Sequence, residues 1–431
     1  MKVPAHRASV PRVTTDDAAR TATDLRDIPE ADCDRALDLC YSVFHLAPGD
    51  RTRRHHEELL RAALRIGAYD GGQLAGMAGA HRRTLSVPGG QLPCAAVDFV
   101  SVLPTHRRRG ILGSMMEELW RRCAADGRPL ACLWASEPAI YGRYGFGAAT
   151  ELCHIEIDAS RPLALRLAPD SRPLRLIDPA EAPAALAPRY DATLALRAGR
   201  FTRDESWWRC GALDLDGAQM DLPANGFGAV RVVVLGAPGH APGGYAVYRT
   251  RGAGDDRPGV VSVGELEAES APAAAALWSY LASIDLTSTV RVQGRPADDP
   301  LLHLAADRDQ VRVTGQEPNL WLRLVDVRTA LTARSWAAPV DLVLDLRDTA
   351  LPANAGRFRL TAGPGGATWE PADEAPDLSL DVRELSSCYL GGTPLRHLAH
   401  AGLVTEHTPG AVRRLDAALQ TELLPFTGEN Y

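Results

Sequence analysis

The stretch that decides the fold lies at residues 95–135 and reads AAVDFVSVLPTHRRRGILGSMMEELWRRCAADGRPLACLWA. It begins with a mostly apolar run that Pro104 stops, which is typical of a strand because proline cannot continue a central ladder. Apolar residues then recur every four positions from Ile111, as on one face of a helix, and Gly127 ends that helix. Residues 130–135 are apolar again. This order predicts two parallel strands joined by a helix in one sheet.

The rest of the chain predicts further α/β and α+β regions. Apolar spacing over residues 31–64 indicates a helix, and residues 1–22 are unpatterned and predicted to form a disordered tail. The strand–helix–strand order recurs over residues 244–292, but the predicted loop at 264–269 carries three glutamates in place of three arginines. Carboxylates would repel an anion, so this copy is predicted to lack the anion site. Strand-like and helical segments alternate again from residue 319.

Length and composition limit the number of domains and the kinds of function to be expected. The 431 residues exceed one ordinary domain, so two or three domains are expected. A net charge of −7 argues against a general nucleic-acid or membrane-surface role and is compatible with a cationic small substrate. The eight cysteines form no CxxC pair, and no signal peptide or run of about 18 apolar residues is evident, so a reduced, cytoplasmic protein is expected. His55, His56, His397 and His400 lack a third ligand and are interpreted as solvated or structural, so no metal is expected.

The loop THRRRGIL at residues 105–112 stands between a predicted strand and a predicted helix. Backbone N–H groups at a helix N-terminus favour an anion, and arginine side chains bind phosphate oxygens through two parallel hydrogen bonds. Gly110 lets the backbone approach such a ligand because it has no Cβ. A solvated basic turn is the alternative. The position at a strand-to-helix turn favours the anion site.

This loop resembles the pyrophosphate loop of the GCN5-related N-acetyltransferase (GNAT) family, [RQ]-x-x-G-x-[GA], except that Leu112 stands at its last position. A second block, YGRYGFG at 141–147, resembles the Tyr-x-x-x-Gly-Phe stretch of that family. The block FVSVLPTHRRRG at 99–110 is similar to the Eis (enhanced intracellular survival)-like members, and Leu112 agrees with them. LWLR at 320–323 and RRLDAA at 413–418 extend the resemblance over nearly the whole chain.

The resemblance implies an α/β fold with mixed sheets: tandem GNAT-like domains followed by a sterol-carrier-protein-like C-terminal domain. The expected limits are 23–155 for a catalytic domain that binds acetyl-CoA, 156–315 for a second GNAT-like domain without a cofactor site, and 316–431 for the sterol-carrier-like domain, whose C-terminus reaches the active site. It also implies a hexameric N-acetyltransferase that acetylates amines of aminoglycoside-like polycations by direct attack on the thioester.

Two other functions remain open on the sequence alone. One is acetylation of lysines in peptides or proteins, which differs from the first function only in the acceptor pocket. The other is a non-catalytic protein that binds an apolar ligand through its sterol-carrier-like domain.

The resemblance implies two catalytic groups, with Tyr141 as general acid and the terminal carboxylate of Tyr431 as general base. A phenol is protonated at pH 7 and can donate, whereas a terminal carboxylate with a pKa of roughly 3.5 needs desolvation or a water relay to act as base. Packing against the cofactor is the alternative for Tyr141. A disordered chain end is the alternative for Tyr431.

The resemblance also implies which residues contact the two substrates. Ser136 would lie near the thiol or would cap the short helix that follows it. Asn430 stands where family examples carry an acidic residue, so Glu429 and Asp98 are the candidates to supply a carboxylate to the amine. The implied cofactor-binding residues are Val100 and Val102 through their backbone, Arg107, Arg108, Gly110 and Ile111 at the pyrophosphate, and Ser136 near the thiol, while Asp98 and Phe99 line the amine pocket.

Overall fold

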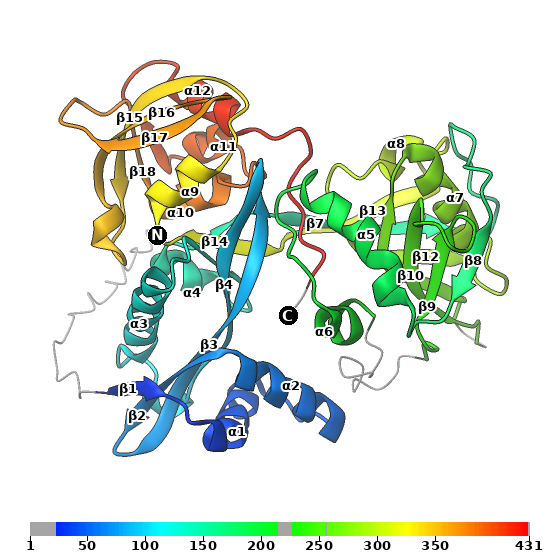
Figure 1. Ribbon diagram of the computed structural model, residues 1–431, viewed down its shortest axis with the longest axis horizontal. Coiled ribbons are helices and arrows are strands. Elements are labelled where there is room, and N and C mark those ends of the chain that lie inside the picture. The colour runs from blue at the N-terminus through cyan, green and yellow to red at the C-terminus, as the bar shows by residue number, and fades with distance from the viewer. Residues whose placement is uncertain (1–22, 214–225, 255–256, 430–431) are drawn as a thin grey trace, which may run out of the picture.

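The computed structural model describes residues 23–213, 226–254 and 257–429, and the N-terminal segment 1–22, predicted to be disordered, lies outside them. Within these ranges the chain forms three β-sheets with helices packed against them, which confirms an α/β fold with mixed sheets. Figure 1 shows the first sheet below the third, with the second sheet beside both of them.

The first sheet contains the predicted strand–helix–strand unit. β4 (Gly90–Val102) and β5 (Leu130–Trp134) pair in parallel and α3 (Ile111–Ala125) joins them, as predicted. The helix expected over 31–64 is two helices, because His45 adopts a left-handed conformation (φ 57°) at the end of the first. In sheet order the strands are β1 (Asp24–Asp27), β2 (Leu64–Asp70), β3 (Gln73–Val87), β4, β5, β14 (Leu320–Leu324) and β6 (Gly147–Ala148), and the other helices are α1 (Cys33–Phe44), α2 (Asp50–Ala62) and α4 (Pro138–Tyr141).

The second sheet repeats this unit without its loop. β11 (Val260–Ala268) and β12 (Thr289–Arg295) pair in parallel and α7 (Ala271–Ala282) joins them, as predicted. The predicted loop at 264–269 is wrong, because most of this segment continues β11, where buried arginines neutralise the Glu265 and Glu267 carboxylates. In sheet order the strands are β13 (Val311–Pro318), β7 (Glu151–Asp158), β12, β11, β10 (Gly244–Arg251), β9 (Arg231–Leu235) and β8 (Leu174–Ile177), and the other helices are α5 (Ala182–Leu194), α6 (Glu205–Trp207) and α8 (Leu301–Leu304).

The third sheet belongs to the α+β region predicted near the C-terminus. The buried leucines of this region, among them Leu342 of its sheet and Leu385 of a helix, form one core with Leu130 and Leu322 of the first sheet, so the third domain is seated directly on the first. In sheet order the strands are β17 (Gly366–Pro371), β16 (Gly356–Gly363), β15 (Val340–Arg347), β18 (Leu378–Asp381) and β19 (Val404–Glu406), and the helices are α9 (Val327–Ala333), α10 (Val382–Cys388), α11 (Leu395–His400) and α12 (Ala411–Leu419).

Two strands cross the expected domain limits. β7 pairs with β12 and β13 in the second sheet, so the expected limit after residue 155 falls inside a strand. β14 lies between β5 and β6 in the first sheet, although residues 316–431 were expected to form the third domain. All five residues of β14 are buried, because β5 and β6 pair with its two edges and its leucines pack in the core shared with the third domain. The chain therefore passes twice between the first two sheets.

After α12 the chain leaves the third domain and runs between the other two, as the red segment in Figure 1 shows. We call residues 420–429 the tail. The Phe426 N–H donates to the Ala198 carbonyl at 2.9 Å, and the Thr427 hydroxyl donates to the Gly199 carbonyl at 2.7 Å. The Asn319 side chain donates to the Thr427 carbonyl at 2.6 Å. These bonds fix the tail between the first and second domains.

The structure also bears on the expectations about cysteines, membrane spans and metal sites. All eight cysteines are free and seven are buried, as predicted for reduced core residues. Nowhere in the described ranges does a helix combine the length and the apolar character that a membrane crossing requires. In the same ranges, no group of three or more His, Cys, Asp or Glu side chains is placed to hold a metal ion.

Candidate active site

β4 carries a distortion in its second half. Its register with β3 shifts between Met77 and Gly79, and Phe99 adopts a left-handed conformation (φ 54°). The Asp98 carboxylate stabilises this turn by accepting a hydrogen bond of 2.7 Å from the Phe99 N–H. Gly79 leaves room for it, since a Cβ there would lie 3.1 Å from the Phe99 ring. This bulge re-aims the residues that follow it.

On its other edge β4 separates from β5. The two strands pair only at residues 94–96 and 130–132, and no strand of the described chain continues this edge of β4. The backbone groups of Val100 and Val102 on that edge are therefore available to a ligand. This geometry fits their implied role in binding the cofactor through the backbone, which stays a prediction.

We call residues 105–110 the arginine loop, and its basic side chains differ in their partners. Arg109 pairs with Asp70 at 2.8 Å, and His106 lies 3.4 Å from the same carboxylate. Arg107 and Arg108 are exposed, and among the described residues no carboxylate pairs with either of them. Arg108 also has a left-handed backbone (φ 62°), a conformation that costs on the order of 1–3 kcal/mol and that clusters at functional sites. Two arginines are therefore left for an anion.

The N-terminus of α3 completes this anion site. Gly110 (φ 81°) precedes Ile111 as the N-cap, and no side chain caps the first turn. The first amide groups of the helix are therefore not satisfied by a cap and point toward the loop. A pyrophosphate group has the negative charge and the acceptor oxygens that Arg107, Arg108 and these amide groups would bind, and their implied role at the cofactor stays a prediction.

Tyr141 lies at the end of α4, beside the second half of β4. Its side chain is buried and packs edge-to-face against Phe146, with 5.9 Å between the ring centroids. Burial, and after it the negative charge of Asp98, raises the pKa of Tyr141 to about 12. The phenol therefore stays protonated at neutral pH, as a proton donor must. Tyr141 packs against Phe146, and both its role as general acid and its packing against the cofactor stay predictions.

Ser136 lies on the surface between β5 and α4. The residue that caps α4 is Glu137, and no side chain makes a capping hydrogen bond there. The interpretation of Ser136 as a helix cap is therefore wrong. Its nearness to the thiol of the cofactor stays a prediction.

Two histidines lie beside Asp98 and Phe99, the residues predicted to line the amine pocket. The His56 ring lies edge-to-face to Phe99 at 6.3 Å, and the Tyr41 hydroxyl lies 3.0 Å from His56 Nδ1. His81 is buried, with its Nε2 3.8 Å from the Asp98 carboxylate. Burial lowers the pKa of His56, so its ring is neutral at pH 7. Sequence reasoning missed this placement, because the packing of α1 and α2 on β4 leaves no local sequence signal.

The glycines of the block at 141–147 receive helix α10 of the third domain. A Cβ at Gly142 would lie 2.7 Å from the Arg383 guanidinium, and a Cβ at Gly147 would overlap the Ser387 hydroxyl. These glycines therefore serve the close approach of two domains. The third domain thereby supports the turn that carries Tyr141.

Comparison with known proteins identifies the three domains. Residues 24–149 and residues 199–328 each match the Acetyltransferase (GNAT) domain family, and residues 327–428 match the Sterol carrier protein domain family. The N-acetyltransferase Eis of Mycobacterium tuberculosis is 35% identical over 370 residues, which cover 84% of this chain and 86% of the relative. The chain belongs to the Eis family of GNAT N-acetyltransferases.

Two further relatives span nearly the whole chain. An uncharacterized N-acetyltransferase of Streptomyces avermitilis is 36% identical over 411 residues, covering 94% of this chain and 98% of that protein. The crystal structure of Eis1 from Mycobacterium abscessus matches with a TM-score of 0.82 at 35% identity, covering 95% of this chain and all of that one. GNAT acetyltransferases use acetyl-CoA, and Eis-family members act on amines. The alternative of a non-catalytic protein is therefore wrong.

In this Eis-family enzyme the residues near the C-terminus divide into two groups. Tyr431 and Asn430 lie outside the described residues, so the implied role of Tyr431 as general base stays a prediction. Glu429 is described, and its side chain is fully buried against Arg203 at 2.7 Å. It is therefore not available as the carboxylate that meets the amine. Of the two candidates, only Asp98 keeps a partly exposed carboxylate.

Proposed function

We propose that this Eis-family enzyme acetylates amines of aminoglycoside-like polycationic small molecules by direct attack on acetyl-CoA. The observation that carries the proposal is the open edge of β4. Along this strand, Asp98 acts electrostatically on Tyr141, the backbone at Val102 is available to a ligand, and the two unpaired arginines follow. An acid, a backbone donor and a phosphate site thus follow one another in the order that acetyl transfer requires.

Acetyl-CoA supplies an acetyl group activated as a thioester when it is bound. Arg107 and Arg108 would hold its pyrophosphate together with the free amide groups that begin at Ile111. The Val102 N–H would donate to the thioester carbonyl and so stabilise the negative charge that grows on that oxygen. The role of the chain here is to bind and orient.

Two tyrosines would move the protons. The amine nitrogen forms a bond to the acetyl carbon while the carbon–sulfur bond breaks. The terminal carboxylate of Tyr431 takes the proton that the amine loses, and the Tyr141 phenol donates a proton to the departing thiolate. The raised pKa of Tyr141 keeps that proton in place until the sulfur leaves. The products are an amide and a neutral thiol.

The acceptor pocket favours a cation with an apolar face. The Asp98 side chain is partly exposed and presents a carboxylate beside His81. Phe99 and the neutral ring of His56 form a wall next to it. The net charge of −7 attracts a polycation more strongly than a molecule with one charge. These features support an aminoglycoside-like acceptor over a single lysine side chain.

Release of free thiol from acetyl-CoA tests the proposal when it is measured with a panel of aminoglycosides and with lysine peptides. We expect turnover with aminoglycosides, and we expect Tyr141→Phe to lower kcat on the order of 10²- to 10⁴-fold without raising KM for acetyl-CoA. Tyr280→Phe is the matched control, because it removes a hydroxyl that bonds to Tyr248 in the second domain. Turnover on lysine peptides alone would contradict the proposed acceptor. Unchanged kcat in Tyr141→Phe would remove the acid role.

Family resemblance also leads us to propose a hexamer in the cytoplasm. Light scattering coupled to size-exclusion chromatography measures the assembly directly. A mass of about six chains is expected, and a monomer at all concentrations would contradict it.

A further inference from the structure

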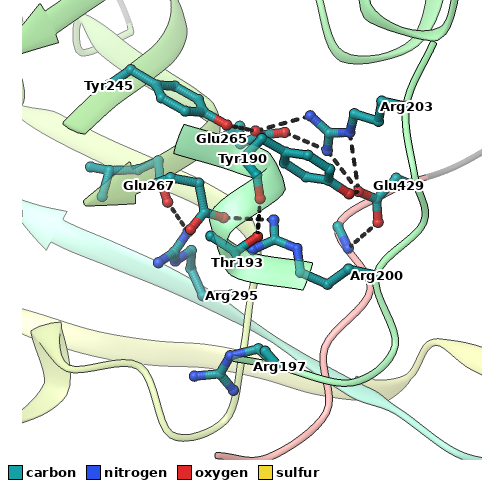
Figure 2. A network of polar contacts seen from close by, with 12 residues as sticks. Tyr190, Thr193, Arg197, Arg200, Arg203, Tyr245, Glu265, Glu267, Arg295 and Glu429 are labelled. Atoms are coloured by element: carbon teal, nitrogen blue, oxygen red, sulfur yellow. Dashed lines mark hydrogen bonds and ion pairs between the residues drawn. The ribbon is translucent and has the colours of Figure 1, made fainter. Parts of the chain in front are cut away.

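The tail ends in a buried cluster of charges in the second domain, shown in Figure 2. Arg203, in the segment before α6, donates two hydrogen bonds to Glu265 of β11, at 3.0 and 2.8 Å. The same guanidinium donates to Glu429 at 2.7 Å. The exposed fractions of the Arg203 and Glu429 side chains are 1% and 0%. We call Arg203, Glu265 and Glu429 the tail latch.

Aromatic residues enclose the tail latch. The Arg203 guanidinium lies 3.7 Å from the centre of the Tyr190 ring and 4.6 Å from that of Trp208, so it contacts both rings, which themselves meet edge-to-face. The Tyr190 hydroxyl is within hydrogen-bond distance of Glu429, and the Tyr245 hydroxyl donates to Glu265. Each carboxylate of the latch therefore has a phenol as well as the guanidinium for a partner.

The latch joins the tail to the sheet through one cation. Burial alone would raise the pKa of Glu265, but Arg203, and after it Arg200 and the Tyr245 hydroxyl, lower the pKa, so this carboxylate is ionised. Without Arg203, Glu265 and Glu429 would be two buried carboxylates that repel each other. Because β11 is fixed in the sheet, that repulsion would displace the tail. The position of Glu429 therefore depends on Arg203.

We propose that Arg203 is a positioning residue for acetyl transfer, which acts by holding Glu429 so that the terminal carboxylate two residues later faces the amine. Two residues extend a chain by at most about 7 Å, so anchoring Glu429 confines the carboxylate to a small volume. A cavity of about 350 Å³ borders the latch at Gly428 and Glu429, and second-domain residues such as Tyr248 and Gln293 line the rest of it. The proposal rests on the base role of Tyr431 proposed above.

Glu429→Gln keeps the shape of the side chain and removes its charge. We expect kcat to fall on the order of 10- to 100-fold, because a small misplacement of a reacting group has an effect of that size. KM for acetyl-CoA should not change, since the arginine loop lies in the first domain. Removal of Tyr431 should lower kcat at least as far. Glu429→Gln added to that truncation should cause no further loss, because both changes act through one carboxylate.

A second readout does not depend on catalysis. Carboxypeptidase digestion followed by mass spectrometry of the intact protein measures how readily the tail leaves its site. We expect faster release of the terminal residues in Glu429→Gln, and also in Arg203→Lys, because a lysine cannot bind two carboxylates with a planar fork. Glu156→Gln is the matched control. Glu156 of β7 pairs with Arg291 at 3.1 Å in the same domain, outside the network of Figure 2, and its change should affect neither readout.

The outcomes separate the two proposals. Equal release rates in the wild type and in Glu429→Gln would overturn the latch, and so would a full additional loss of kcat in the truncated double variant. Unchanged kcat after removal of Tyr431 would overturn the base role instead, and the release rates would then still decide whether the latch holds the tail.

Discussion

The two GNAT domains of this enzyme put one scaffold to opposite electrostatic uses. In the first domain eight residues, 103–110, join the central strand to its helix, whereas in the second only residues 269–270 do so. The first turn of α3 has no side-chain cap, whereas the Ser270 hydroxyl accepts a hydrogen bond of 3.3 Å from the Ala273 N–H at the start of α7. One helix keeps its amide groups for a ligand. The other satisfies one of them from within the chain.

The charges of the two domains differ in the same way. Arg107 and Arg108 are exposed, with no carboxylate partner in the described chain, whereas Glu265 and Glu267 are bound by buried arginines at 2.8 and 2.6 Å. Both central strands nevertheless carry a register shift against their antiparallel neighbour. The bulged strand is therefore part of the common scaffold. The length of the connection and the pairing of its charges decide what each domain can hold.

The largest effect is expected when the first domain loses the two arginines that distinguish its loop from the second domain. Arg107→Ala with Arg108→Ala should weaken acetyl-CoA binding more than about 100-fold, because a hydrogen bond from a charged group is worth about 1.5–3 kcal/mol. Isothermal titration calorimetry measures the Kd. Arg109→Ala is the control, since Arg109 is already paired with Asp70, and it should have a much smaller effect. Equal losses in the two variants would contradict the division of tasks within the loop.

The next largest effect is expected where helix α10 of the third domain packs against the turn that carries Tyr141 in the first domain. Gly147→Ala should destabilise the protein by about 1–3 kcal/mol, because the added Cβ overlaps the Ser387 hydroxyl of α10. It should also lower kcat by shifting Tyr141. Calorimetric unfolding and turnover measure the two effects. Gly365→Ala is the control, because its added Cβ meets nothing within 4 Å.

A smaller effect is expected where the second domain satisfies its own helix. Ser270→Ala should lower the free energy of unfolding by about 1 kcal/mol through loss of the α7 cap. Denaturant unfolding measures it. The Kd for acetyl-CoA should be unchanged, since this helix is not expected to bind cofactor. Weaker acetyl-CoA binding in this variant would show that the second domain takes part after all.

The smallest effect concerns the dependence of kcat on alkaline pH, where we expect no decline from Tyr141. The acid must be protonated, and burial raises the pKa of Tyr141 to about 12, so proton donation persists to higher pH than with an ordinary phenol of pKa about 10. We expect kcat to show no loss from this group between pH 9 and about 10.5. A decline centred near pH 10 that Tyr141→Phe abolishes would contradict the raised pKa.

The sequence predicts those parts of the site that are contiguous in the chain. The strand, the arginine loop and the helix lie within residues 95–135, so their spacing was enough to place them in order. The sequence wrongly predicts a loop at residues 264–269, because charged residues are uncommon in strands and the arginines that neutralise Glu265 and Glu267 lie elsewhere in the chain. The approach of His56 to Phe99 left no local sequence signal.

The sequence by itself determined the three domains, the parallel strand–helix–strand unit and the position of the arginine loop within that unit. Only the tertiary structure decided that β14 enters the first sheet and that Glu429 belongs to the tail latch instead of the amine pocket. The physical reason is that strands and helices follow from the periodic burial of neighbouring residues, which the sequence displays directly. The partner of a buried strand or of a buried charge is chosen by packing between distant segments, and no spacing along the chain records that choice.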